Sequence, residues 1–146
     1  MTQGFVTIPF KTESGMSSVN GAAKFSSAGI VLEFESKLFG LISNGVKEAR
    51  LSIGDLLDIK FRKGVLKRGA KIEIRLRSFT QLSELPNKEG KVILKIFPDD
   101  YDRARDAVDR LIKDMAEHAA ALPPPHAPLR SLFDESDDGQ HDHGDQ

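Results

Sequence analysis

The chain has 146 residues, of which 39% are hydrophobic and 29% are charged, and it contains no cysteine. This length suits one domain with a sizeable core, and the lack of cysteine excludes disulfides, iron–sulfur clusters and thiolate zinc sites. No apolar run reaches the roughly 18 residues of a membrane span and no secretory signal opens the chain, so we expect a cytoplasmic protein. The net charge of −1 divides unequally, because residues 1–118 carry +4 and residues 119–146 carry −5.

Most of the first part of the chain has the period-two pattern of β-strands. In four segments one face is apolar and the other polar, which is typical of an antiparallel sheet solvated on one side. These clear strands are predicted at residues 30–35, 59–62, 71–77 and 92–97, with weaker ones at 4–11, 21–26, 46–53 and 79–84. Turn signals separate them at residues 26–29, 44–45, 63–69 and 86–90.

Residues 38–42 are apolar without a clear alternation. We expect them to form a buried strand or loop under the C-terminal helix. If they are exposed, they offer a surface for a partner or for a second copy of the chain in a homo-oligomer.

The segment 98–118 has the pattern of an amphipathic helix. Pro98 suits a first helical turn, and Asp99 and Asp100 complement the positive end of the helix dipole. An apolar stripe at helical spacing predicts a face that lies on the sheet. The stripe comprises Ala104, Val108, Leu111, Ile112 and Met115.

Residues 119–146 hold four of the seven prolines and then a run of acidic and small polar residues. Such a composition cannot bury enough apolar area to offset the cost of ordering the chain. We interpret the segment as a disordered tail, Pro-rich and then acidic. Leu129, Leu132 and Phe133 are either stray apolar residues or a short docking motif, and we interpret residues 141–143 (HDH) as solvated rather than metal-binding.

The order of parts, six or seven short strands and then one amphipathic helix, resembles the pleckstrin-homology-like superfamily, in particular its small bacterial members and the related GRAM domains. The resemblance covers about residues 21–118. It rests on the strand pair 21–25 and 29–36, on the stretch around 53–61 (SIGDLLDIKF), and on GKVILKIF followed at once by PDDYDRARDAVDRLI. It implies a mainly β domain over residues 1–118 with one C-terminal α-helix. In that family the helix caps one end of a bent, partly closed antiparallel barrel.

Residue types needed for catalysis are missing from the expected barrel. All four histidines lie at the end of the helix or in the tail, and no cysteine can supply a thiolate. Glu33 and Glu35 share a strand face, but carboxylates on a solvated face are usually surface residues rather than an acid–base pair. We therefore expect no enzyme, with no catalytic residue, metal or cofactor.

The strongest charge feature is the segment 58–77, which carries eight basic residues against two acidic ones. Its net charge of +6 exceeds that of residues 1–118, so the rest of the domain is slightly acidic. Antiparallel pairing would join the basic residues of two strands into one surface, and the loop between the strands adds two apolar residues. The candidate partner- or lipid-binding residues are Lys60, Arg62, Lys63, Val65, Leu66, Lys67, Arg68, Lys71, Arg75 and Arg77.

Several interpretations of this hairpin remain open. An acidic protein could bind it, and the chain's own residues 134–138 are one candidate. An anionic membrane surface could attract the cations while Val65 and Leu66 enter the interface, which would make the protein membrane-peripheral. Nucleic acid is less favoured, because Phe61 alternates inward and no aromatic side chain is left for stacking.

The hairpin could also be a solvated strand pair that only resists edge-to-edge aggregation. We favour a non-enzymatic interaction module that binds an acidic protein partner, with the acidic tail as a regulator. Binding to anionic lipid through the same hairpin is the alternative function.

Overall fold

A computed structural model describes residues 4–14, 17–38, 41–64 and 69–122, without the side chains of residues 14, 38 and 42–44. The chain divides into two units, residues 1–115 and 116–146, and the C-terminal helix runs from the first into the second. The strands and helices are β1 (Val6–Ser14), β2 (Ser17–Ser26), β3 (Gly29–Leu38), β4 (Leu41–Ser52), β5 (Leu56–Lys63), β6 (Ala70–Leu76), α1 (Phe79–Ser83), β7 (Val92–Ile96) and α2 (Tyr101–Ala121).

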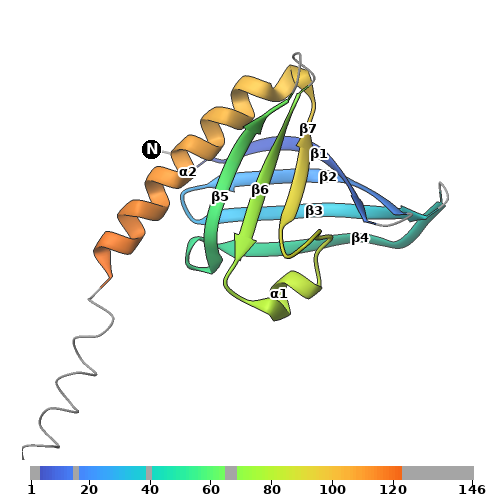
Figure 1. Cartoon of the computed structure of the whole chain (residues 1–146), viewed down its shortest axis with the longest axis horizontal. Helices are drawn as coiled ribbons and strands as arrows, with labels where there is room; N and C mark the ends of the chain where they lie inside the picture. Colours follow the sequence, from blue (N-terminus) through green and yellow to red (C-terminus); the bar gives the residue numbers. More distant parts are fainter. Residues whose placement is uncertain (1–3, 15–16, 39–40, 65–68, 123–146) are drawn as a thin grey trace, which may run out of the picture. The chain divides into compact units, whose positions relative to one another are not determined.

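The strands form one antiparallel sheet in the order β4-β3-β2-β1-β7-β6-β5 (Figure 1). Strand β1 pairs with β2 along its whole length, but with β7 only at Phe10↔Ile96 and Lys11↔Lys95. This short pairing joins two groups of consecutive strands, β1–β4 and β5–β7, into a sheet that curls as a half barrel. The prediction of a mainly β fold, a bent and partly closed antiparallel barrel with one C-terminal helix, is confirmed.

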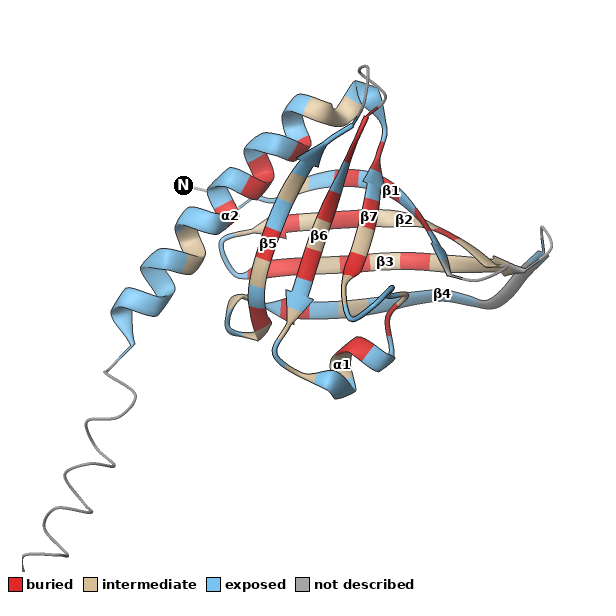
Figure 2. Ribbon diagram, in the orientation of Figure 1, coloured by how far each residue is buried: buried red, intermediate tan, exposed pale blue. Residues whose placement is uncertain are grey.

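The alternation of the strands decides which side chains form the core. In β6, Ala70, Ile72 and Ile74 are buried while Lys71 and Arg75 are exposed, and Figure 2 shows such alternation along the neighbouring strands. The four clear strand predictions fall in β3, β5, β6 and β7, and none extends more than one residue beyond its strand, although β3 and β5 are each three residues longer at one end. Those predictions are confirmed.

Helix α2 lies across the end of the half barrel where β1 begins and β2 turns into β3 (Figure 1). Its buried face consists of Ala104, Ala107, Val108 and Leu111. Met115, the last residue of the predicted stripe, is only partly buried against the core. The expectation that Ile112 belongs to the core is wrong, since its side chain is 45% exposed.

The weak strand predicted at residues 79–84 is wrong, because residues 79–83 form helix α1. Ser78 caps this helix, and its hydroxyl oxygen accepts a hydrogen bond from the backbone nitrogen of Gln81 at 3.2 Å. A capping serine can start a helical turn where the apolar pattern is too short to specify a strand.

The turn predicted at residues 44–45 is also wrong, because β4 runs through it with a register shift opposite Glu35 and Ser36. Gly45 takes a φ of +69° there, which a glycine adopts easily beside a β-bulge. The register aligns the end of β1 with this end of β3 and β4, through Ser14↔Ser17, Ser17↔Leu38 and Leu38↔Leu41. Leu41 is 74% exposed at this far end, so the expected burial of residues 38–42 under the helix is wrong for Leu41.

The strand pair that carried the family resemblance is not the first hairpin of the chain. Residues 21–25 and 29–36 lie in β2 and β3, and β1 precedes them as a full partner of β2. The weak strand prediction at residues 4–11 located this extra strand, although β1 continues to Ser14.

Candidate anion-binding face

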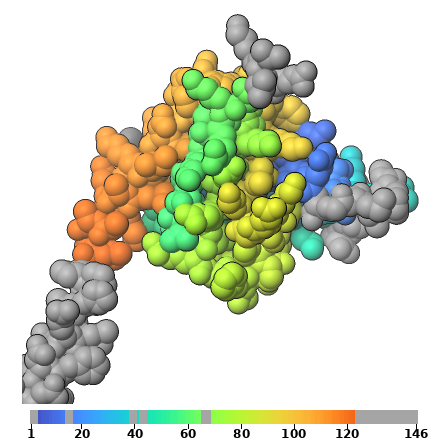
Figure 3. Space-filling model, viewed as in Figure 1, coloured from blue at the N-terminus to red at the C-terminus, as the bar shows by residue number. Residues whose placement is uncertain are grey.

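The hairpin β5–β6 presents its basic residues on the outer, solvated face of the half barrel, which Figure 3 views from the front. Lys60 and Arg62 of β5 and Lys71 and Arg75 of β6 are all exposed, because they alternate with the core residues of each strand. These four predicted residues are therefore brought onto one surface.

Two of the other predicted residues, Lys63 and Arg77, belong to the described part of the chain. Lys63 ends β5, and Arg77 follows β6 at the opposite end of the hairpin, where its backbone nitrogen donates to the Asp55 carbonyl oxygen at 3.0 Å. Val65, Leu66, Lys67 and Arg68 lie outside the described residues.

Register divides the hairpin face into two parts of different charge. Asp58 lies opposite Arg75 and Lys60 lies opposite Glu73, so toward the start of β5 each cation faces a carboxylate. Arg75 Nε donates to Asp58 Oδ2 at 3.1 Å. Lys91, just before β7, approaches Glu73 Oε1 at 3.7 Å. We call this part, consisting of Asp58, Lys60, Glu73, Arg75 and Lys91, the paired end.

The ion pair between Asp58 and Arg75 at the paired end stabilises the charged form of both groups. Hydrogen bonding from the Arg75 guanidinium lowers the pKa of the Asp58 carboxyl below its usual value, and the same contact raises the pKa of Arg75. Both groups therefore stay ionised near neutral pH, and each neutralises the other.

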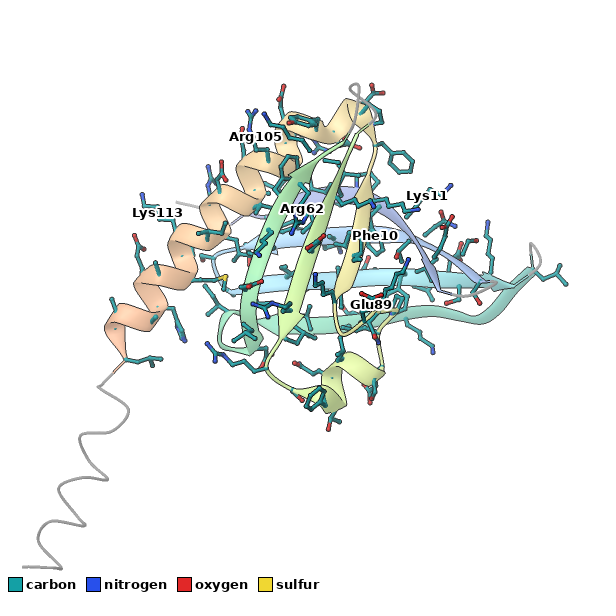
Figure 4. The ribbon with its side chains drawn as sticks, viewed as in Figure 1. Phe10, Lys11, Arg62, Glu89, Arg105 and Lys113 are labelled. Atoms are coloured by element: carbon teal, nitrogen blue, oxygen red, sulfur yellow. The ribbon has the colours of Figure 1, made fainter. Side chains whose placement is uncertain are left out.

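Cations from four adjacent strands line up on the rest of the face. Lys11 of β1 lies opposite Lys95 of β7, Lys95 lies opposite Lys71 of β6, and Lys71 lies opposite Arg62 of β5. We call Lys11, Lys95, Lys71 and Arg62 the basic row. Because neighbouring strands are about 4.8 Å apart, the row spans about 14 Å across the sheet. Figure 4 labels its two ends, Lys11 and Arg62, with β7 and β6 between them.

The row is only partly neutralised. Arg62 Nε lies 2.8 Å from Glu73 Oε2, and Lys95 Nζ lies 3.2 Å from Glu13 Oε1. For Lys11 and Lys71, the described residues provide no ion pair. Like charges directly opposite one another destabilise a sheet. The basic row therefore lowers the stability of the fold, whereas the paired end, with opposite charges facing each other, does not.

A small pocket opens in the basic row where β1 separates from β7. It has a volume of about 130 Å³ and is lined by Thr12, Glu13, Lys71, Asn87, Lys88 and Lys95, among others. A second pocket of about 180 Å³ lies at the paired end, lined by its five residues. The face thus holds two small pockets of similar size and different charge.

Sequence reasoning missed Lys11 and Lys95 as members of this site. The alternation of apolar and polar residues predicts that Lys11 and Lys95 are both solvated. It does not predict that their strands are neighbours in the sheet. The β1–β7 pairing joins residues more than eighty positions apart, and no local signal marks it.

A larger cavity, about 660 Å³, lies between the start of β1, the β2–β3 turn and α2. Its charged lining balances, with Arg103 and Arg110 against Asp106 and Asp114, so charge selects no ligand class there. Within the described ranges, no three His, Asp or Glu side chains come together as a metal site requires. None of the described helices is long and apolar enough to cross a membrane.

Comparison of the chain with protein-family models, with curated proteins and with solved structures gives no match.

Proposed function

We propose that the protein is a non-enzymatic interaction module that binds an acidic segment of a partner protein along the basic row. The observation that carries this proposal is the line of four cations across β1, β7, β6 and β5, of which Lys11 and Lys71 have no ion pair among the described residues. Four cations side by side destabilise the sheet more than alternating charges would. An acidic ligand that binds along the row removes this repulsion. An extended acidic segment of a few residues is long enough to follow its length of about 14 Å.

The proposal differs in one respect from the expectation based on the hairpin alone. Arg75 already has a carboxylate partner in Asp58, so it contributes little free positive charge to a ligand. Lys11, which does not belong to the hairpin, adds a cation with no ion pair among the described residues. Lys95 also joins the row, with Glu13 as its exposed partner.

The test is fluorescence anisotropy of a labelled peptide of alternating aspartate and serine, with an asparagine–serine peptide as the uncharged control. We expect the full chain to bind the acidic peptide with an affinity that falls as salt is added, because exposed charge pairs are screened. Lys71→Ala should weaken binding about fivefold, corresponding to about 1 kcal/mol for one exposed pair.

Lys113→Ala is the matched control, since Lys113 is exposed on α2 away from the sheet (Figure 4). Equal losses in the two variants would contradict the proposal. So would binding of the full chain to anionic vesicles but not to the acidic peptide, which would favour a lipid ligand instead.

A further inference from the structure

The pocket in the basic row has a composition that indicates a more specific ligand than an acidic side chain. Strand β1 pairs with β7 only as far as Lys11, so the next residues leave an opening between the two strands. Lys71 and Lys95 line it from the sheet, and Lys88 lines it from the turn before β7. With Glu13 as its one carboxylate, the lining carries a formal charge of +2.

Thr12 is the one buried residue among those that line this pocket. It is only 6% exposed and is the one buried polar side chain among the residues that the structure describes. It occupies an inward-facing position of β1, after the core residues Ile8 and Phe10, where an apolar residue would satisfy the strand pattern equally well. A hydroxyl there can donate a hydrogen bond to an oxyanion that enters the pocket.

Hydrogen bonds define the turn that carries Lys88. Lys88 and Lys91 exchange two backbone hydrogen bonds, of 2.8 and 3.1 Å, around the two residues Glu89 and Gly90. Both of these have positive φ angles, 56° and 81°, as a tight hairpin turn requires, and Figure 4 marks Glu89. Asn87 Nδ2 donates to the carbonyl oxygens of Leu82 and Leu85, each at 3.1 Å, which fixes the segment before the turn.

The size of the pocket limits what it can hold. Its volume of about 130 Å³ is enough for one tetrahedral oxyanion. A phosphate monoester carries a charge of about −1.5 to −2 at neutral pH and three acceptor oxygens, which matches the +2 lining better than a single carboxylate does.

The second pocket of the face is also small, but its charge does not match that of a phosphate monoester. Its three cations, Lys60, Arg75 and Lys91, stand beside Asp58 and Glu73, so its formal charge is +1 and two of the cations are already in ion pairs.

We propose that the Thr12 pocket binds the phosphoryl group of a phosphorylated serine or threonine in the acidic partner. This inference rests on the proposed function and names the chemistry of its partner. Lys71, Lys88 and Lys95 supply the charge-assisted hydrogen bonds, and Thr12 supplies a neutral one. Glu13 is largely exposed, and its ion pair with Lys95 has to break when the phosphoryl group enters.

The experiment compares two labelled peptides of alternating aspartate and serine that differ only by one central phosphoserine, each titrated with the full chain. We expect the phosphopeptide to bind about tenfold tighter. Thr12→Val and Lys88→Ala should bring this ratio close to one while leaving the unphosphorylated peptide nearly unaffected. Thr12→Ser, which restores the hydroxyl, should recover the ratio, and Glu13→Gln should increase it. Lys91→Ala, at the paired end, is the matched control and should leave it unchanged.

The possible failures are distinguishable. Equal binding of both peptides by the wild-type chain overturns this inference and leaves the proposed function intact, whereas binding of neither peptide overturns both. Inorganic phosphate that binds as tightly as the phosphopeptide overturns the assignment to a protein partner. The assignment to a protein partner is also overturned if Thr12→Val and Lys88→Ala weaken binding of the chain to phosphoinositide vesicles but do not weaken its binding to the phosphopeptide.

Discussion

The basic row and the paired end lie side by side on one face of one sheet, yet they differ in how their charges are used. At the paired end, Asp58 and Glu73 each lie opposite a cation, and the Asp58–Arg75 hydrogen bonds hold both groups ionised. In the basic row the same strands place cation opposite cation, with Lys71 between Lys95 and Arg62. Strand register therefore decides which part of a basic surface is stabilising and which part is available to a ligand.

The largest effect expected from this difference is on binding. Lys71→Glu replaces the cation at the centre of the row by an anion, so it removes one attraction and adds one repulsion. We expect a loss of about 2 kcal/mol in affinity for the acidic peptide, about 30-fold, twice the value for a neutralised exposed pair. Anisotropy titration measures it.

The matched variant for that experiment is the double substitution Asp58→Asn with Arg75→Gln. It should reduce affinity several-fold less than Lys71→Glu, because it removes an ion pair whose net charge is already zero. If both substitutions weaken binding equally, the division of the face into two parts is wrong.

A smaller effect is expected on stability at the paired end. Asp58→Asn should lower the free energy of unfolding at neutral pH by about 0.5–1 kcal/mol, the range for partly exposed ion pairs. The pKa of Asp58 is lowered in the folded state, so its contribution is present above the carboxyl's unfolded pKa and is lost as the pH falls through the folded pKa.

Urea unfolding of the wild-type chain and Asp58→Asn, at neutral pH and again in acid, measures this contribution. The difference between the two proteins should shrink below about pH 4, the usual pKa of an aspartate. A constant difference across the whole pH range would contradict the role of the ion pair.

The smallest effect expected is a gain in stability at the basic row. Lys71→Thr removes like-charge repulsion from both neighbouring strands and keeps a residue that favours strands, so it should raise the free energy of unfolding by about 0.5 kcal/mol. The gain should disappear in high salt, where the repulsion is screened. Destabilisation by Lys71→Thr at low salt would show that the row does not strain the sheet.

Local patterns in the sequence predicted much of this fold and part of the site. The period-two segments in β3, β5, β6 and β7 and the amphipathic helix follow from side-chain periodicity, which is a property of neighbouring residues. By contrast, helix α1 depends on the capping hydrogen bond of Ser78, and the continuous β4 depends on a bulge at Gly45. Neither feature changes the local apolar pattern enough to be predicted from it.

The site shows the same limit. The sequence identified the hairpin as basic, but it gave Arg75 and Lys71 equal weight because both alternate outward. Only the cross-strand register separates Arg75, opposite Asp58, from Lys71, opposite Lys95 and Arg62. The pairing of β1 with β7, which adds Lys11, depends on the strand order of the whole sheet and not on any short motif.

The central claim is that an acidic ligand lies along the basic row, and an NMR titration of the isotope-labelled full chain with the acidic peptide tests it most directly. We predict that the largest amide and side-chain shifts occur at Lys11, Lys71 and Lys95, with small changes at Asp58 and Arg75. Shifts centred on the paired end or on α2, with the row unperturbed, would contradict the account.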